Sequence, residues 1–396
     1  MTTTGDQQLV KRINRSVLLR LIRARPGLSR AQLAGHSGLT KSTVSLLVRD
    51  LVEEGWLEEA PATAAPGLGR PSTPLQINAR SLGIVGVEVA IDCVRVVGVS
   101  LVGEVLWSSE EPLASMAPAA VCAHAARLAR AAHDALVGLG LRLSGVGVGL
   151  PGAFDETTGL VRFAPNLGWR NVDFLAQITC ALSQAGLPDV PVHTQNEADT
   201  AALSEYEFFG GDGEDALVFI NCDVGVGAGI VLNDRLFAGA QGMAGEIGHT
   251  IVQVDGPLCS CGRLGCAEAF IGARAIARNT AQLGHIRPAG HYLGVLLQNL
   301  WTTFNPSVLV VGGPSCARHP ELVQMARDTL NGYATSAGMA APVVRVARYG
   351  MLASAVGAAA LVLHQYLRPM QRRAQPAGVA PAGGDADSFQ PSLEPS

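Results

Sequence analysis

The chain has 396 residues, of which 48% are hydrophobic and 16% charged, and its formal net charge is −4. This length and composition predict two or three domains with large buried cores. No apolar stretch approaches the roughly 20 residues of a bilayer span, and the N-terminus lacks the apolar core of a signal peptide, which argues against a membrane or secreted protein. Five cysteines are scattered and three are clustered, as is typical of the reducing cytoplasm, where we expect the protein.

The charge is unevenly distributed along the chain. Residues 1–80 hold eleven Lys and Arg against six Asp and Glu, a net charge of +5, whereas the remainder carries −9. A basic arm on an acidic body indicates that the N-terminal segment meets a polyanion.

Residues 14–57 have the pattern of three helices joined by tight turns, because apolar side chains recur there at helical spacing. Pro26 falls where the first helix should end. Ser29 can cap the second helix and Thr40 the third. Two helices joined across a short turn that contains Gly38 form a helix-turn-helix signature.

The outer face predicted for the third helix carries side chains that suit a major groove. Its short hydroxyl donors and cations can reach base edges and phosphates. Two strand-like segments around a Pro/Ala/Gly-rich loop follow, which predicts a wing whose arginine enters the minor groove. A helical bundle for oligomerisation, or a linker, is the alternative. The predicted DNA contacts are Lys41, Ser42, Thr43, Ser45, Arg49 and Arg70.

From residue 82 onward, strands and helices alternate in a pattern that occurs twice. Each half opens with three short strands, and helical segments follow. The predicted strands lie at 83–89, 93–99, 104–108, 216–222, 226–232 and 236–238. The repeat predicts two α/β lobes that face a cleft, which is the usual place for a ligand.

Three loops that follow apolar strands expose amides or acids that can line this cleft. They are residues 150–152, 165–169 and 195–199. Asn and Glu together supply the donors and acceptors that adjacent sugar hydroxyls require. Each loop taken alone also has the composition of an ordinary turn.

Four soft metal ligands lie within eighteen residues of the second lobe, with the spacing His-x9-Cys-x-Cys-x4-Cys. Gly262 and Gly265 allow so short a loop to fold around an ion. Four protein ligands leave no open coordination position, so we expect a closed, structural Zn²⁺ and no zinc-dependent hydrolysis. Buried cysteines used as hydrophobic residues, or half-formed disulfides, are the alternative. The predicted ligands are His249, Cys259, Cys261 and Cys266.

The same stretch resembles the ROK family, the bacterial group of sugar kinases and sugar-responsive repressors. The hallmark of that family is GExGH followed by CxCGxxGCxE, and residues 245–249 and 259–268 match it position for position. The resemblance implies an α/β, actin-like ATPase (ribonuclease H-like) fold in two lobes over residues 81–368, behind a winged helix-turn-helix over residues 1–80.

The resemblance also implies which side chains meet a sugar. In the family the glutamates of the motif and the zinc-bound histidine reach sugar hydroxyls, together with asparagines of the cleft loops. Two solvated surface glutamates are the alternative for the acids. The implied sugar contacts are Asn166, Asn196, Glu197, Glu246, His249 and Glu268.

The phosphate loops distinguish a kinase from a repressor. ROK kinases follow an acid in the first lobe with Gly-Gly-Thr, and here those positions are Ala90, Ile91 and Asp92, whose bulk and charge oppose a polyanion. Residues 223–229 keep only part of the second phosphate loop. Glu197 stands where the kinases place a catalytic aspartate. We therefore expect no enzyme activity and a sugar-responsive repressor with a degenerate kinase fold.

The expected partners are operator DNA, a monosaccharide effector and a second copy of the chain, as a homodimer or higher homo-oligomer. Two other functions stay open at this point. One is an active ATP-dependent sugar kinase with a DNA-binding head, and the other is a sugar-independent scaffold or architectural DNA-binding protein. Residues 369–396, rich in Pro, Ala, Gly and Ser, are predicted to be a disordered tail.

Overall fold

The computed structural model describes residues 7–61, 73–155, 158–209, 216–240, 242–283 and 286–369. The predicted wing loop with Arg70 lies outside the described residues, as does the predicted tail beyond Pro369.

The N-terminal head is a three-helix unit with a two-stranded sheet. A capping box between Ser29 and Gln32 starts its second helix, and the Thr40 hydroxyl accepts from the Thr43 amide to start the third. Both predicted caps are therefore confirmed. The elements are α1 (Gln7–Ala24), α2 (Arg30–Ser37), α3 (Lys41–Glu53), β1 (Leu57–Glu59) and β2 (Leu75–Ile77), and the two strands pair antiparallel at the base of the predicted wing.

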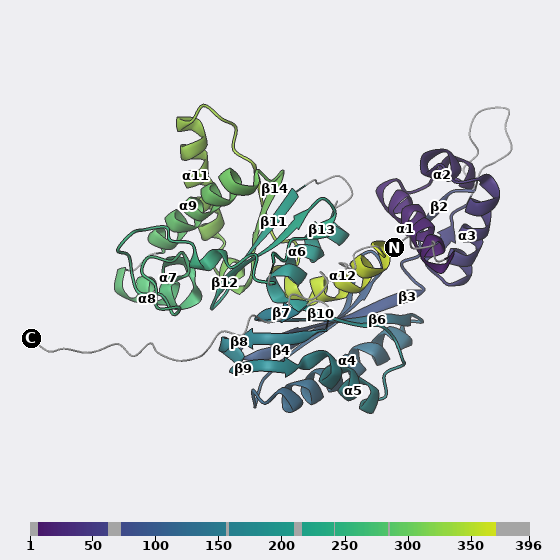
Figure 1. Cartoon of the computed structure of the whole chain (residues 1–396), viewed down its shortest axis with the longest axis horizontal. Coiled ribbons are helices and arrows are strands. Elements are labelled where there is room, and N and C mark those ends of the chain that lie inside the picture. Colours follow the sequence, from purple (N-terminus) through teal and green to yellow (C-terminus); the bar gives the residue numbers. More distant parts are fainter. Residues whose placement is uncertain are drawn as a thin grey trace, which may run out of the picture.

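The first lobe is a five-stranded sheet in the order β10-β6-β3-β4-β5. Its strands are β3 (Leu82–Val89), β4 (Cys93–Ser100), β5 (Val105–Pro112), β6 (Arg142–Leu150) and β10 (Val192–Asn196). Helices α4 (Pro118–Gly138) and α5 (Phe174–Gln184) cover one face. A small antiparallel sheet of β7 (Ala153–Asp155), β8 (Leu160–Ala164) and β9 (Trp169–Asp173) extends the lobe (Figure 1).

The second lobe repeats the plan with the order β13-β12-β11-β14-β15. Its strands are β11 (Ala216–Cys222), β12 (Val226–Leu232), β13 (Arg235–Leu236), β14 (Val308–Gly312) and β15 (Val343–Val346). Its helices are α7 (Glu268–Ile271), α8 (Ala273–Leu283), α9 (Arg287–Phe304), α10 (Pro314–Arg318) and α11 (Glu321–Ser336). The strand predicted at 236–238 begins earlier, because Asn233 and Asp234 both adopt positive φ and turn the chain in two residues.

Two helices, α6 (Glu197–Phe208) and α12 (Ala353–Leu367), lie between the sheets of the two lobes (Figure 1). Glycines let α12 approach the first sheet closely. A Cβ on Gly147 of β6 would lie 1.7 Å from the carbonyl oxygen of Ala358, and one on Gly86 of β3 would lie 2.0 Å from that of Ala355. The α12 helix therefore forms the centre of the molecule.

One finding departs from the sequence analysis, which noted no segment of membrane-spanning character. Within the described residues, Gly350–Leu367 is long and apolar enough to cross a bilayer by length and composition. Because 72% of this segment is buried inside the protein, its hydrophobicity is that of a core helix.

Candidate effector cleft, metal centre and DNA-binding face

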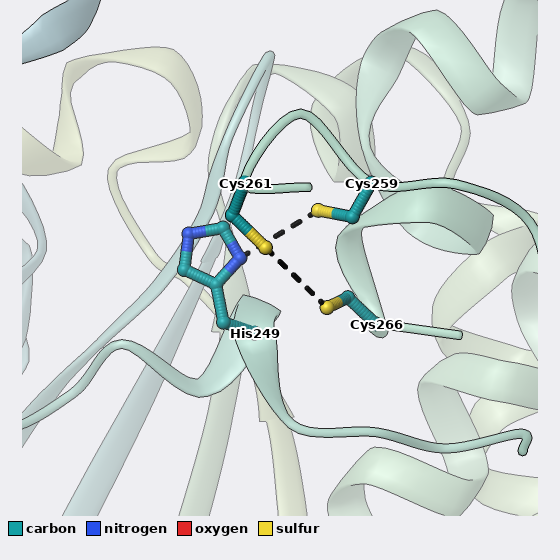
Figure 2. Close-up of side chains that lie close together, drawn as sticks. All are labelled: His249, Cys259, Cys261 and Cys266. Atoms are coloured by element: carbon teal, nitrogen blue, oxygen red, sulfur yellow. Dashed lines mark hydrogen bonds between the residues drawn. The ribbon is translucent and has the colours of Figure 1, made fainter. Parts of the chain in front are cut away.

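The four predicted metal ligands converge. Their ligand atoms all lie within 4.8 Å of one another, and Figure 2 shows the sulfur atoms and the imidazole nitrogen gathered around one point. The distance from Cys259 Sγ to His249 Nδ1 is 3.7 Å, as is that from Cys261 Sγ to Cys266 Sγ. A tetrahedral zinc ion bound at about 2.3 Å has ligand–ligand edges of about 3.8 Å, so this donor set fits the ion. The distance between the two sulfur atoms is too long for a disulfide, and all three cysteines are free.

The loop around these ligands depends on glycine. Gly262 and Gly265 have φ of 85° and 74°, and a Cβ on Gly265 would lie 1.7 Å from the carbonyl oxygen of Gln253. The backbone amide of Arg263 and its guanidinium, whose Nε lies 3.3 Å from Cys261 Sγ, lower the pKa of Cys261 to about 6. This thiol is therefore a thiolate at neutral pH, which is the form that binds a metal.

Glu268 ties the metal loop to the turn between β11 and β12. One carboxylate oxygen accepts from Ser260 Oγ at 2.8 Å, and the other accepts from the Val226 amide at 3.2 Å. Glu246 precedes the short 3₁₀ helix Ile247–His249 and is an exposed residue, although desolvation of its carboxyl group raises the pKa. The metal loop thus borders the second phosphate loop directly.

Asn196 joins two of the three predicted cleft loops. Its Oδ1 accepts from the Ala198 amide at 2.8 Å and caps α6, while its Nδ2 donates to the Gly152 carbonyl at 3.1 Å. Asn166 lies in the 3₁₀ helix Pro165–Leu167 and is exposed. It makes no hydrogen bond with the other candidate sugar contacts that the structure describes, so its place in the site stays a prediction.

Glu197, the first residue of α6, has a buried carboxylate oxygen, Oε2, without a hydrogen-bond partner among the described residues. Burial, together with the nearby Glu88, Glu246 and Asp223, raises the pKa of Glu197 to about 8. At pH 7 this group is therefore mostly protonated and can donate a hydrogen bond. A buried polar atom left unpaired marks a place where a ligand oxygen fits.

An ion pair that the sequence analysis missed lies in the β3–β4 hairpin, whose turn holds the first phosphate loop positions. Arg95 of β4 is buried, lying 3.2 Å from Glu88 Oε2 and 2.6 Å from Glu110 Oε2. Burial raises the pKa of Glu88 to about 7 despite this arginine. The signal was present, because Glu88 and Arg95 stand directly opposite each other in the β3–β4 hairpin. Residues 90–92 form its turn, closed by a hydrogen bond from the Ala90 amide to the Cys93 carbonyl.

Glycines in the second phosphate loop and at the end of β14 divide into two groups by the room around them. A Cβ on Gly229 would lie 2.2 Å from the Ala198 carbonyl, and one on Gly313 would lie 2.3 Å from Asn221 Oδ1, so packing alone requires both. Gly225 and Gly227 would make ordinary contacts at 3.4 Å. Packing therefore does not by itself require glycine at these two positions.

The predicted DNA-binding face of α3 is exposed at Lys41, Ser42, Ser45 and Arg49. The hydroxyls of Ser42 and Thr43 lie 2.9 and 2.8 Å from Thr40 Oγ1, so they also take part in the helix cap. Arg49 lies 3.4 Å from Asp50 and 3.7 Å from Glu53. Leu46, which the sequence analysis did not single out, is 48% exposed on the same face.

A helix-turn-helix head, two actin-like lobes and a cluster of four candidate metal ligands define a transcriptional regulator built on a sugar-kinase fold. The ROK family model matches residues 134–290, and the model of the IclR helix-turn-helix domain matches residues 16–61. The chain belongs to the ROK family.

The relatives of this chain include repressors, a regulator of known structure and a sugar kinase. The xylose repressor of Caldicellulosiruptor bescii is 32% identical over 281 residues, which cover 69% of this chain and 67% of that protein. The xylose repressor of Bacillus subtilis is 28% identical, with 92% and 98% covered. The crystal structure of a ROK family transcriptional regulator, described as a homologue of the E. coli MLC protein, superposes with a TM-score of 0.72 at 24% identity, with 91% and 97% covered. The glucokinase of Halalkalibacterium halodurans is 30% identical over 263 residues, covering 56% of this chain and 77% of that enzyme.

Proposed function

We propose that this chain is a sugar-responsive transcriptional repressor that binds operator DNA through its head and a monosaccharide in its cleft. One observation carries the proposal: a single chain holds both the exposed α3 face and the unpaired buried carboxylate oxygen of Glu197. An effector in the cleft can change the affinity for DNA when it binds one conformation of the protein more tightly than another.

In this proposal the sugar meets side chains from both lobes and from the metal loop. Glu197 in its protonated form donates to a sugar oxygen, and the other contacts accept from or donate to adjacent hydroxyls. A zinc ion would hold the metal loop in shape from four protein positions. The proposed sugar contacts are Asn166, Asn196, Glu197, Glu246, His249 and Glu268, and the proposed zinc ligands are His249, Cys259, Cys261 and Cys266.

The second candidate is an active sugar kinase, which the similarity to glucokinases favours. We propose that this chain has lost that activity. The side chains of Ile91 and Asp92 occupy sequence positions at which the family's kinases have small residues, and their bulk and charge oppose a nucleotide's phosphates. A Glu197 that keeps its proton at pH 7 is also a poor general base.

Operator recognition by two heads requires two chains, because half-sites are usually read by symmetric pairs. We therefore propose a homodimer or higher homo-oligomer that acts on DNA in the cytoplasm.

The proposal is tested with a DNA fragment from the promoter region next to the gene. Mobility shifts of that fragment are recorded with full-length protein and a panel of D-xylose, D-glucose, D-mannose, D-galactose and N-acetyl-D-glucosamine. We expect a specific complex that one of these sugars releases. A complex that no sugar changes would favour the scaffold, and the absence of any specific complex would remove DNA regulation altogether.

A further inference from the structure

The α6 helix begins at the proposed effector site and ends at the head. Glu197 is its first residue, and Glu207 lies in its last turn. Twelve residues of α-helix span about 17 Å, so one rigid element connects the two places. Glu207 therefore lies at the end of α6 that is far from the proposed effector site.

The carboxylate of Glu207 is buried and contacts three side chains, which come from α1, from α12 and from the residue that follows α12. Arg23 of α1 donates from Nη1 to Oε2 at 2.7 Å, and also to the Glu207 carbonyl oxygen. From α12, His364 Nδ1 lies 2.7 Å from Oε1, and just beyond α12 Arg368 Nη1 donates to Oε1 at 2.5 Å. Burial alone would raise the pKa of Glu207, but Arg23 and Arg368 outweigh it and lower that pKa, so Glu207 remains charged. Arg23 is the member of this cluster that belongs to the head.

The near end of α6 is joined to α12 by direct backbone proximity. A Cβ on Gly357 would lie 1.6 Å from the Thr200 carbonyl oxygen, so the helices approach as closely as glycine permits. Ser354 Oγ donates to the Glu197 carbonyl at 3.1 Å and lies 3.1 Å from Thr200 Oγ1. Such close packing does not deform continuously, and α6 and α12 should therefore move as one body.

The head also touches both lobes. Arg142 of β6 in the first lobe donates to the Glu54 carbonyl of the head at 2.6 Å. Arg20 of α1 pairs with Asp234 in the β12–β13 turn of the second lobe. A rotation of one lobe against the other therefore cannot leave every head contact unchanged.

The joint between head and lobes combines apolar packing with polar contacts, because Leu19 and Ile22 of the head belong to the same buried cluster as Leu101 and Leu363. A cavity of about 560 Å³ lies there, lined in part by Ile22, Arg23, Gln76, Val102, Glu207 and Phe208. Glu207 and Arg23 stand at its wall. The Arg23–Glu207 contact thus supplements apolar packing at the joint, and it is a partly buried charged contact between α1 and α6.

From these contacts we infer that Glu207 is a positioning residue for the effector response. It holds Arg23 at the end of the α6–α12 pair, so that movement at the cleft changes the placement of the head. This inference rests on the proposed function, and it identifies the junction through which that function operates. In this role Glu207 contacts neither the sugar nor the operator DNA.

A variant of the head residue Arg23 tests the inference without changing the buried residues around Glu207. Arg23→Ala removes the head's ligand but leaves Glu207 with His364 and Arg368, so the core cluster stays paired. Arg25→Ala is the matched control, because this exposed arginine also belongs to the head and its loss changes net charge equally. Operator affinity of the full-length variants is measured by fluorescence anisotropy, with and without the sugar of the panel that releases the wild type.

Effector coupling is typically worth a factor of about 5–150 in affinity. The coupling ratio is the operator affinity without sugar divided by the operator affinity with sugar. We expect the wild type and Arg25→Ala to have the same coupling ratio, and we expect the ratio of Arg23→Ala to be below about 2. Calorimetry without DNA should give Arg23→Ala a sugar affinity within about threefold of the wild-type value, which a general structural defect would not preserve.

Glu207→Gln changes the α6 side of the same contact and should also lower the ratio. Calorimetry without DNA should give this variant a sugar affinity close to that of the wild type, which shows that its sugar site is folded. An Arg23→Ala variant that releases DNA as fully as Arg25→Ala overturns the inference and leaves the proposed function intact. A wild type that no sugar releases overturns the proposed function, and the inference with it.

Discussion

The indole ring of Trp56 stacks on the phenol ring of Tyr366, with ring centroids 4.1 Å apart and planes 16° apart. Trp56 follows α3 in the head, and Tyr366 is in the last turn of α12. Arg15 of α1 donates from Nε to the Tyr366 hydroxyl at 3.1 Å, so two elements of the head hold one side chain of the central helix. The DNA-binding unit is therefore docked on the helix that runs between the lobes.

Tyr366→Leu should loosen the head without unfolding the lobes. A stacked aromatic pair contributes about 0.5–1.5 kcal/mol, so amide hydrogen exchange in α1 should rise by about 2–10-fold, while exchange in β3 and β11 stays constant. Tyr333→Leu, on the exposed face of α11, is the matched control. Equal exchange in α1 of both variants would show that the stacking does not hold the head.

Cys266→Ser should lose the metal, because three ligands no longer complete a tetrahedral site. We expect about one zinc per chain in the wild type and in Cys180→Ser, whose exposed thiol lies outside the cluster, and much less in Cys266→Ser. Metal content is measured by elemental analysis of the dialysed proteins. The sugar response should fall with the metal while operator binding persists. Unchanged zinc in Cys266→Ser contradicts the ligand set.

The stability of the lobes should depend on pH through Glu197. Its pKa is 4.5 in the unfolded reference and about 8 in the fold, where it faces Glu88, Glu246 and Asp223. The folded state thus holds a proton that the unfolded state releases, so this group's contribution to stability declines as pH rises from about 4.5 to 8.

Glu197→Gln removes that dependence. The melting temperature of the variant relative to wild type should therefore rise between pH 5 and pH 8.5, by about 2–4 °C for each kcal/mol. Glu104→Gln, at an exposed position, provides the comparison. A constant difference between variant and wild type across this range would show that Glu197 titrates normally.

Lys41→Ala should weaken operator binding and reduce the slope of log affinity against log salt by about 1, as expected for one lost phosphate contact. Lys41 is the first residue of α3 and is exposed. Arg49→Ala should have the smaller effect, because Asp50 and Glu53 already compete for that guanidinium. Titrations at several salt concentrations measure both variants. A larger loss for Arg49→Ala would reverse our ranking of the two contacts.

The sequence allowed much of this fold to be predicted, because its signals are local. The caps at Ser29 and Thr40, the three opening strands of each lobe and the ligand spacing of the metal loop depend on residues close together in the chain. The convergence of His249 with the three cysteines was predicted, and the geometry confirms it.

What sequence reasoning missed depends on contacts between distant residues. Arg95 was overlooked because its role appears only when β3 and β4 pair and bury it beside Glu88. The Arg23–Glu207 contact joins residues 184 positions apart, and no spacing rule connects them. The membrane-like composition of α12 likewise reflects packing between two lobes, which only the assembled fold shows.

The central claim is that the cleft senses a sugar and does not phosphorylate it. The most direct measurement is ADP production by purified full-length protein with Mg-ATP, at the sugar concentration that releases operator DNA, beside a glucokinase assayed in the same way. The account predicts that DNA is released while ADP stays at the level without sugar. Sugar-dependent ADP production that Glu197→Gln abolishes would contradict it.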